Sequence, residues 1–572
     1  MIRRYVRWIK GRFERAGDDG NIVVEGARTG SGRARNRLVM TMAVFMAMYA
    51  AIGGRLVYLG LQDLPDDGGP AQRNTAARPD IIDRNGEILA TDIKTFSLFA
   101  EPRRIVDVDE AIEKLVTVLP DLNYEQTYHR LRTDAGFVWL RRQLSPRQQA
   151  EIMALGIPGI GFRSENRRFY PGGAIAAHVL GLVDIDNKGI AGIEKYIDQQ
   201  GLADLREIGL ADRASLKPFQ LALDIRVQHI LHDELTRAME RYQAIASGGV
   251  VLNAQTGEVV AMVSLPDYDP NNPVDAHRSD RLNRMSGGVF EMGSTFKGFT
   301  TAMALDSGLV TLNDSFDARR PLQVGKFTIR DFHGKGRVLS VPEIFIYSSN
   351  IGTARMAETI SIEDHRAFFQ RIGLLDKLDT ELPEVATPTG PEEWKRVNRI
   401  TISFGHGVAT TPLQTAVSAA ALVNGGVLFD PTFLPRNTSE AVEHATAVLN
   451  PSTSDAMRYL FRLNVEKGSG RRADVPGYFV GGKTGTAEKV VNGRYSTDKR
   501  FNAFLSAFPV NNPQYVVLVI LDEPKPEQPG MSATSGLNAA PVVSNVVRRS
   551  APLLGVMPEF GHESAALLVS TQ

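Results

Sequence analysis

Three short clusters of residues have types and spacings that together suit acyl transfer. Lys297 follows Ser294 by three residues, Asn350 follows Ser348 by two, and Lys483 begins a Lys-Thr-Gly-Thr stretch. A serine hydroxyl is a poor nucleophile until a base removes its proton, and an amine one helical turn away is a candidate base. The second cluster adds a hydroxyl and an amide, and the third adds a cation beside a glycine. In this order the clusters predict a covalent serine site.

Each cluster alone is weak evidence, because short motifs recur by chance. Ser-x-x-Lys recurs at Ser496 to Lys499 and Ser-x-Asn recurs at Ser164 to Asn166, but neither has the other motifs in order around it. Lys-Thr-Gly occurs once. The ordered set, with each member in a suitable local context, favours function over chance.

The residues around Ser294 predict a buried helix with this serine in its first turn. An apolar-rich run from Phe296 to Leu305 ends at Asp306-Ser307-Gly308. Residues i and i+3 share a helix face, so Lys297 is expected beside Ser294. The free N–H groups of that turn would favour a developing oxyanion. The alternative, an N-capping serine with a solvated lysine, explains the helix start but not the other motifs.

The second cluster is expected at a junction between two helices. Ser340 to Glu343 has the pattern of a capping box with proline in the first turn, which predicts a helix from Val341 to Tyr347. Ile351 to Ile360 predicts the next helix. A polar linker without function is the alternative, since Ser and Asn favour such places.

The third cluster, Lys483-Thr484-Gly485-Thr486, is expected on a strand. Glycine inside a strand often marks close backbone approach by a ligand. Ala503 to Phe508 and Tyr515 to Leu521 predict two further strands. Together they indicate an antiparallel sheet whose edge strand includes Lys483. Ala539 to Leu554 predicts a closing helix packed on this sheet.

Lys297 can act as a base only when it is neutral. An ordinary lysine pKa is near ~10.4, so holding the amine neutral at pH 7 costs about 4–5 kcal/mol. Burial and a second cation such as Lys483 would both lower that pKa. The backbone N–H groups of Ser294 and Thr486 would be the oxyanion donors, each typically worth about 3–4 kcal/mol. Lys483 with Thr484 or Thr486 could also hold a substrate carboxylate.

The chain resembles the class B penicillin-binding proteins over nearly everything after an N-terminal apolar segment. The ordered motifs are typical of penicillin-binding proteins and serine β-lactamases. Further similar stretches are Arg78 to Gly86, Arg168 to Pro171, Ala177 to Gly181, Asp224 to Gln228, Gly405 to Gly407 and Thr411 to Gln414. The resemblance implies an α/β (α+β) serine penicillin-recognising transpeptidase domain, an antiparallel sheet flanked by helices. An elongated mixed pedestal domain and one transmembrane helix would precede it.

The implied activity is that of a serine-type peptidoglycan D,D-transpeptidase, which crosslinks stem peptides ending in D-Ala-D-Ala and is acylated by β-lactams. Asn350 and the stretch Tyr268 to Pro273 resemble the division-specific (FtsI-type) branch. Glu291-Met292-Gly293 departs from the usual Glu-Pro-Gly, with little catalytic effect expected because Gly293 is kept. The implied catalytic residues are Ser294, Lys297, Ser348, Asn350 and Lys483, and the substrate-binding or oxyanion residues are Thr484, Gly485 and Thr486.

Three rival classes share part of this pattern. A serine β-lactamase would normally be shorter and secreted, and no glutamate is convincingly placed to hold its deacylating water. A bifunctional class A penicillin-binding protein needs a glycosyltransferase module, but residues 75–218 show none of its acidic motifs. A catalytically inactive scaffold is disfavoured by the intact motifs.

The N-terminal segment predicts a membrane anchor. Leu38 to Gly54 has no charged residue, follows an Arg-rich leader and extends past Arg55 to Leu61, 24 residues in all. That length suits a ~30 Å bilayer core, and the basic flank predicts a cytoplasmic N-terminus. A cleaved signal peptide is the alternative, although leader and apolar run are long for one. We therefore expect a single-pass protein of the inner (cytoplasmic) membrane with a periplasmic catalytic domain, at the division septum.

The chain of 572 residues predicts two or three domains. The expected order is a basic leader (1–37), a transmembrane helix (38–61), a linker (62–74), a dimerisation or pedestal domain (75–218), a transpeptidase domain (219–556) and a tail (557–572). The absence of cysteine excludes thiol catalysis, and the ten histidines show no metal-ligand spacing. No phosphate-binding loop or basic-aromatic stripe is present. We expect no cofactor, no metal and no nucleic-acid partner.

The resemblance also implies partners, because division-type enzymes work with a polytopic SEDS-family glycosyltransferase and other division-complex membrane proteins. A crosslinking enzyme without its own polymerase needs its substrate delivered close to the site. The hypothesised contacts are Leu38 to Leu61 and the hairpin from Arg78 to Ala90. The alternative is a passive anchor and a simple tight turn at Asp83 to Gly86.

Overall fold

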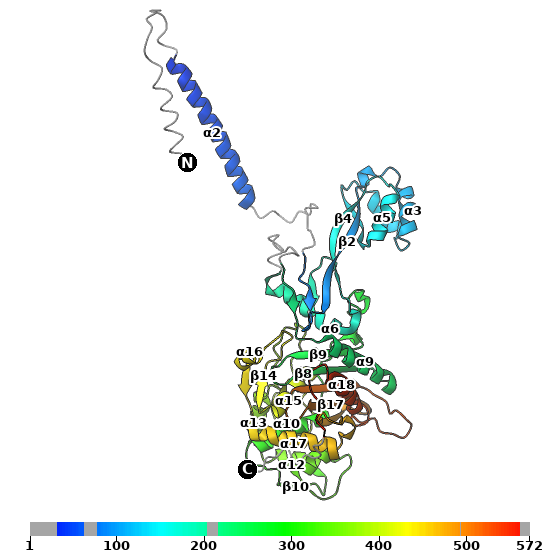
Figure 1. Ribbon diagram of the computed structural model, residues 1–572, viewed down its shortest axis with the longest axis vertical. Helices are drawn as coiled ribbons and strands as arrows, with labels where there is room; N and C mark the ends of the chain where they lie inside the picture. The colour runs from blue at the N-terminus through cyan, green and yellow to red at the C-terminus, as the bar shows by residue number, and fades with distance from the viewer. Residues whose placement is uncertain (1–30, 62–76, 203–215, 326, 492–493, 561–572) are drawn as a thin grey trace, which may run out of the picture. The chain divides into compact units, whose positions relative to one another are not determined.

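A computed structural model describes residues 31–61, 77–202, 216–325, 327–491 and 494–560, which fall into two compact units divided after Gln72. The described part of the first unit is one helix, α2 (Ser31–Leu61), which includes the predicted transmembrane segment (Figure 1). Within the described residues, no helix combines the length and the apolar character that a membrane crossing needs. The transmembrane assignment therefore stays a prediction. Most of the predicted leader, the linker and most of the tail lie outside the described residues.

The second unit begins with an elongated domain built on two long antiparallel strands. β2 (Ile88–Ala100) pairs with β4 (Ile160–Phe169) along ten residue pairs, and β3 (Val138–Leu144) pairs with the other edge of β2. Three amphipathic helices cover the far end of these strands: α3 (Val108–Val118), α4 (Tyr124–Leu131) and α5 (Pro146–Ala154). A small separate core of buried aliphatic side chains holds this head, drawn as a ribbon in Figure 1, together.

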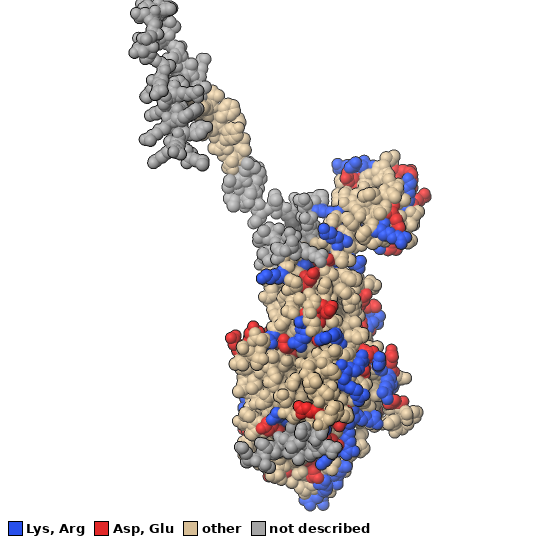
Figure 2. Space-filling view, viewed as in Figure 1, with Lys and Arg blue, Asp and Glu red and all other residues tan. Residues whose placement is uncertain are grey.

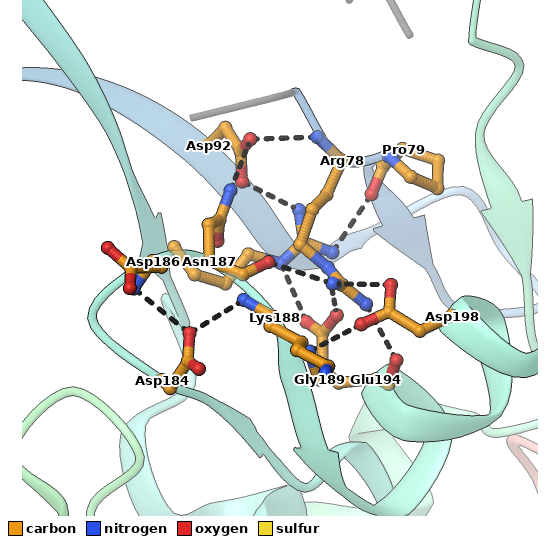
Figure 3. Close-up of polar contacts among 11 residues, drawn as sticks. Arg78, Pro79, Asp92, Asp184, Asp186, Asn187, Lys188, Gly189, Glu194 and Asp198 are labelled. Atoms are coloured by element: carbon orange, nitrogen blue, oxygen red, sulfur yellow. Dashed lines mark hydrogen bonds and ion pairs between the residues drawn. The ribbon is translucent and has the colours of Figure 1, made fainter. Parts of the chain in front are cut away.

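The base of this domain is held by a buried ion-pair network (Figure 3). Glu194 forms an ion pair with Arg78 Nε at 2.7 Å and accepts a hydrogen bond from Arg168 Nε at 2.6 Å, and all three side chains are fully buried. Asp92 binds Arg168 Nη1 at 3.1 Å, and Asp198 binds Arg78 Nη1 at 2.9 Å. Burial raises the pKa of Glu194, but Arg168 and Arg78 outweigh that effect and hold its pKa below the ordinary value. The network joins segments that are distant in sequence.

Glu194→Gln should destabilise the protein by about 3–5 kcal/mol, because it leaves two guanidinium groups buried without their shared carboxylate. Urea unfolding followed by tryptophan fluorescence measures this. Glu151→Gln is the matched control, because Glu151 pairs with Arg147 on an exposed helix face at 2.8 Å, where such a pair is typically worth about 0.3–0.5 kcal/mol. Equal destabilisation by both variants would contradict the account.

The larger domain that follows is organised around a five-stranded antiparallel sheet in the order β16-β17-β18-β8-β9. Its strands are β16 (Gly481–Val491), β17 (Arg494–Phe508), β18 (Tyr515–Asp522), β8 (Ala246–Asn253) and β9 (Val259–Leu265). The three predicted strands are present, and β16, with Lys483, is an edge strand as predicted.

Both faces of this sheet are covered by helices. Along β18, Val516, Leu518 and Ile520 enter one core, and the alternate residues enter another. The first core contains α10 (Phe296–Asp306), α15 (Pro412–Val423) and α17 (Pro451–Lys467); the second contains α9 (Ile225–Tyr242) and α18 (Ala539–Ser550) (Figure 1). A strand buried on both faces has a continuous apolar sequence, which explains the run at 515–521.

Local capping signals set the helix boundaries near the candidate site. α11 (Val341–Tyr347) starts at the predicted capping box of Ser340 and Glu343. α12 (Asn350–Ala357) ends three residues before the predicted Ile360, because Ser361 caps the next helix, α13 (Ile362–Arg371). α18 ends at Ser550 rather than Leu554, since Pro552 has no N–H to continue it.

Charge on the surface is mixed. Lys and Arg side chains alternate with Asp and Glu over the face drawn in Figure 2. This agrees with the equal totals of 65 basic and 65 acidic residues in the sequence.

Candidate active site

The three sequence motifs meet at one cavity of about 680 Å³. Ser294, Lys297, Ser348, Asn350, Thr484 and Thr486 all line it. They come from the start of α10, the α11–α12 junction and the edge strand β16, segments separated by many residues in the sequence. Lys483 reaches the same place through its amine. The stray motifs do not: Ser496 to Lys499 lies on β17 with Lys499 paired to Glu523 at 3.3 Å, and Ser164 to Asn166 lies on β4.

Ser294 lies in a 3-10 turn, Gly293–Thr295, that leads directly into α10. This turn is pressed between the edge strand and a loop. A Cβ at Gly485 would lie 2.4 Å from the carbonyl oxygen of Met292, and a Cβ at Gly405 would lie 1.9 Å from that of Gly293. A close backbone approach was expected at Gly485, and the segment that approaches it is the turn that contains Ser294. Within the described residues, the Ser294 hydroxyl makes no hydrogen bond.

Lys297 is buried on α10, and its amine is directed at the second motif. Its Nζ donates to the carbonyl oxygen of Ser348 at 2.5 Å and to Ser348 Oγ at 3.0 Å. Lys297 was expected beside Ser294, and both line the same cavity. The hydrogen bonds, however, join Lys297 to Ser348.

The second motif lies at the helix junction as predicted. Ser348 ends α11 in the left-handed conformation, with φ 54° and ψ 44°. Ser349 then caps α12 by accepting from the N–H of Gly352 at 2.9 Å. Asn350 Nδ2 donates to the carbonyl oxygen of Arg330 at 2.9 Å. The left-handed conformation of Ser348 directs its Oγ toward the amines of Lys297 and Lys483.

The third motif completes the arrangement from the edge strand. Lys483 is fully buried, and its Nζ donates to Ser348 Oγ at 3.0 Å. Thr484 Oγ1 shares a hydrogen bond with Ser469 Oγ at 2.7 Å, and Thr486 Oγ1 accepts from the N–H of Ser535 at 3.2 Å. Ser348 Oγ therefore faces the amines of both lysines.

The electrostatics of the cavity favour neutral amines. Burial lowers the pKa of Lys297 well below its ordinary value, the Lys483 charge lowers it further, and Asp331 opposes both. Burial lowers the pKa of Lys483 to about 7. Burial, with the Lys297 charge, also lowers the pKa of His406 to about 4. The cavity thus holds titratable nitrogens that can be uncharged near neutral pH.

The structure adds cavity residues that sequence reasoning missed. They are Phe332, His333, Tyr347, Ser469, Arg471, Arg472, Glu488, Arg500, Ser532, Thr534, Gly536 and Leu537. Among these residues, only Ser469 lies in a sequence pattern that could have indicated a site, the glycine-rich stretch Gly468-Ser469-Gly470 at the end of a helix. His406 also lines the cavity, and its ring packs edge-on against Tyr495, with the ring centroids 5.4 Å apart. Among the described residues, no group of three or more His, Asp or Glu could hold a metal.

Two family models match this chain. Residues 248–548 match the penicillin binding protein transpeptidase domain, and residues 73–200 match the penicillin-binding protein dimerisation domain. The chain therefore belongs to the penicillin-binding protein transpeptidase family, and its combination of the two domains is that of a class B penicillin-binding protein, as the sequence resemblance indicated. The predicted boundaries at 218/219 and 556 are not tested by these matches and stay predictions.

Curated relatives and a solved structure agree with this assignment. The chain is 39% identical to the probable peptidoglycan D,D-transpeptidase FtsI of Caulobacter vibrioides, over 86% of this chain and 83% of that protein. It is 32% identical to the probable peptidoglycan D,D-transpeptidase PenA of Neisseria gonorrhoeae, over 94% and 96%. The fold is similar to penicillin binding protein 3 from Mycobacterium tuberculosis, solved with aztreonam, at a TM-score of 0.64 and 23% identity, covering 85% of this chain and 98% of that chain.

Gly485→Ala should abolish acylation of the site, because the new methyl group would collide with the backbone that holds Ser294. Gly298→Ala is the matched control on α10, since a Cβ there would meet only side-chain atoms at 3.7 Å or more. Labelling with a fluorescent penicillin compares the two variants. Normal labelling of Gly485→Ala would show that the glycine is not needed for the close packing.

Proposed function

We propose that this protein is a peptidoglycan D,D-transpeptidase that crosslinks stem peptides during septal cell-wall synthesis and is inhibited covalently by β-lactams. One observation supports this above the others: Ser294 lines a cavity in which Lys297 and Lys483 both donate to Ser348 Oγ. The D,D-transpeptidases among its relatives support the same activity and substrate class.

The first step is acylation of Ser294. Neutral Lys297 takes the hydroxyl proton as Ser294 Oγ attacks the carbonyl carbon between the two D-Ala residues. The backbone N–H groups of Ser294 and Thr486 donate to the oxyanion. When the intermediate collapses, the C–N bond breaks, and the leaving D-Ala amine receives the proton through Lys297 and Ser348. The amine of an acceptor stem peptide then attacks the ester, forms the crosslink and frees Ser294.

The remaining site residues bind the substrate. Lys483 with Thr484 or Thr486 receives the terminal carboxylate, which the charged form of the lysine attracts. Asn350, half-buried at the start of α12, offers its amide to the peptide backbone of the donor stem. A β-lactam enters by the same acylation step and stops there, because its leaving group stays attached.

Ser294 should be the only acylated residue. Mass mapping of the penicillin-treated protein should find the adduct on the peptide containing Ser294 and none in Ser294→Ala. Ser496→Ala is the matched control, since Ser496 belongs to the stray motif on β17, and it should label normally. A persistent adduct fits a transpeptidase, rapid turnover fits a β-lactamase, and an adduct that survives in Ser294→Ala would refute the assignment.

Lys297→Ala should lower the acylation rate by roughly 10²–10⁴, the usual cost of losing a general base. In the wild type, the neutral amine is present above the lowered pKa of Lys297, so acylation should decline as pH falls through that pKa. Stopped-flow labelling across pH measures both effects. A near wild-type rate with an unchanged melting temperature would exclude Lys297 as the base.

The same proposal includes a membrane anchor and partners. We propose that residues 38–61 cross the inner membrane once, with the catalytic domain in the periplasm, and that a SEDS-family glycosyltransferase and other division proteins bind there and at the pedestal hairpin. In the structure Arg78 and Asp83 are buried, Asp83 Oδ1 accepts from the N–H of Asn85 at 2.7 Å, and Arg84 pairs with Glu258 at 3.1 Å. The surface left for a partner is the exposed tip, Asn85 to Ile88.

Exchange of residues 38–61 for an unrelated transmembrane helix, combined with Asn85→Ala and Ile88→Ala, should abolish co-purification with the glycosyltransferase. Glu125→Ala, at an exposed position on α4 of the distant head, is the control. If co-purification and cell division both survive in the combined variant, the proposed contact with the glycosyltransferase is refuted. The anchor is tested separately: a mature N-terminus near Ala51 would show that the segment is a cleaved signal peptide.

A further inference from the structure

Asp331 lies just outside the cavity, in the loop that follows β12 (Phe327–Ile329). Its carboxylate binds the residues that follow Ser348. Ser349 Oγ donates to Oδ2 at 2.7 Å, and the N–H of Ile351 donates to Oδ1 at 2.9 Å. Both oxygens therefore hold the first turn of α12. Asp331 is not one of the residues that line the cavity.

These contacts fix the second motif on the side away from the lysines. The Ser349 hydroxyl donates to Asp331 and accepts from the N–H of Gly352, so it is satisfied both as a donor and as an acceptor. Asn350 adds a bond to the carbonyl oxygen of Arg330 in the same loop. Ser348 adopts a left-handed conformation that non-glycine residues seldom take. Such a conformation persists only where the surrounding structure determines it, and Asp331 contributes by holding Ser349 and Ile351.

Several potential cations surround Lys297, and the Asp331 carboxylate is near enough to act on its charge. Lys297 has Lys483 opposite it from β16, His406 from the loop after α14 (Arg396–Ser403) and Asp331 from the loop after β12. Glu488 on β16 is an acidic residue of the cavity lining, and Asp331 is the carboxylate that acts on Lys297. Its charge raises the pKa of Lys297, against the lowering by burial and Lys483.

We propose that Asp331 is a positioning residue for acylation, an inference that rests on the proposed transpeptidase function. It holds Ser348 Oγ against both amines through Ser349 and Ile351. It also places a negative charge near Lys297. Asp331 itself touches neither the substrate nor the nucleophile.

Two substitutions separate these effects. In Asp331→Asn, the amide oxygen can still accept from the N–H of Ile351, and its NH₂ can donate to Ser349 Oγ, so the geometry is kept and the charge is lost. In Asp331→Ala both contacts are lost. The measurement is the second-order rate constant for acylation by a fluorescent penicillin, taken across pH on the full-length protein, with the melting temperature of each variant.

Asp331→Asn should keep the maximum acylation rate constant (the plateau of the pH profile) within about threefold of the wild-type value. It should also move the acid limb, the pH range in which the rate constant falls as pH decreases, to lower pH, because Lys297 loses the charge that favours its protonated form. Asp331→Ala should lower the plateau by roughly 10²-fold, the effect expected when a catalytic group is displaced by about 1 Å. Rescue of the plateau by Asn is a result that a purely structural role would not give.

Asp314→Asn is the matched control, because Asp314 Oδ2 accepts from the N–H and Oγ1 of Thr311 at 2.7 and 2.9 Å on an exposed turn. It should leave both limb and plateau unchanged. The proposal is overturned if Asp331→Asn leaves the limb in place, or if Asp331→Ala acylates at the wild-type rate. Failure of the wild type to form the Ser294 adduct would instead overturn the proposed function.

Discussion

The site depends on one shared acceptor, Ser348 Oγ, which lies 3.0 Å from the amines of both Lys297 and Lys483. Two ammonium groups buried this close would repel each other in a medium of low dielectric constant. Burial and mutual repulsion together lower the pKa of Lys297, and burial lowers that of Lys483 to about 7. The hydroxyl can then accept from a charged amine or donate to a neutral one, which connects the two lysines as a proton relay.

The rest of the fold keeps this unfavourable pair together. α10 is buried between the sheet and other helices and carries Lys297 inward, and β16 carries Lys483 from the sheet edge. Close backbone contacts at Gly293, Gly405 and Gly485 lock the turn that contains Ser294 against strand and loop, where any side chain would clash. Core packing therefore compensates for the electrostatic cost of the site, a frequent arrangement in active sites.

Local signals in the sequence were sufficient for the parts of the site that depend on neighbouring residues. The capping box at Ser340 predicted α11 at its observed bounds, and the apolar run at 515–521 predicted a buried strand. Motif order predicted that Ser294, Ser348 and Lys483 would meet. The hydrogen bonding of Lys297 to Ser348 rather than to Ser294 depends on the left-handed turn at Ser348. Asp331 and the cavity residues 532–537 have no local pattern, since distant segments place them there by tertiary packing.

Lys297 should be neutral at working pH because it is buried beside Lys483. Titration of lysine side chains by NMR, in full-length protein with ¹³C-labelled lysine and a Lys297→Arg variant for assignment, measures this directly. The account predicts a pKa for Lys297 well below the ordinary lysine value of about 10.4, and a rise toward that value when Lys483 is replaced by Gln. A Lys297 pKa at or above the ordinary value, or one unchanged in Lys483→Gln, would contradict it.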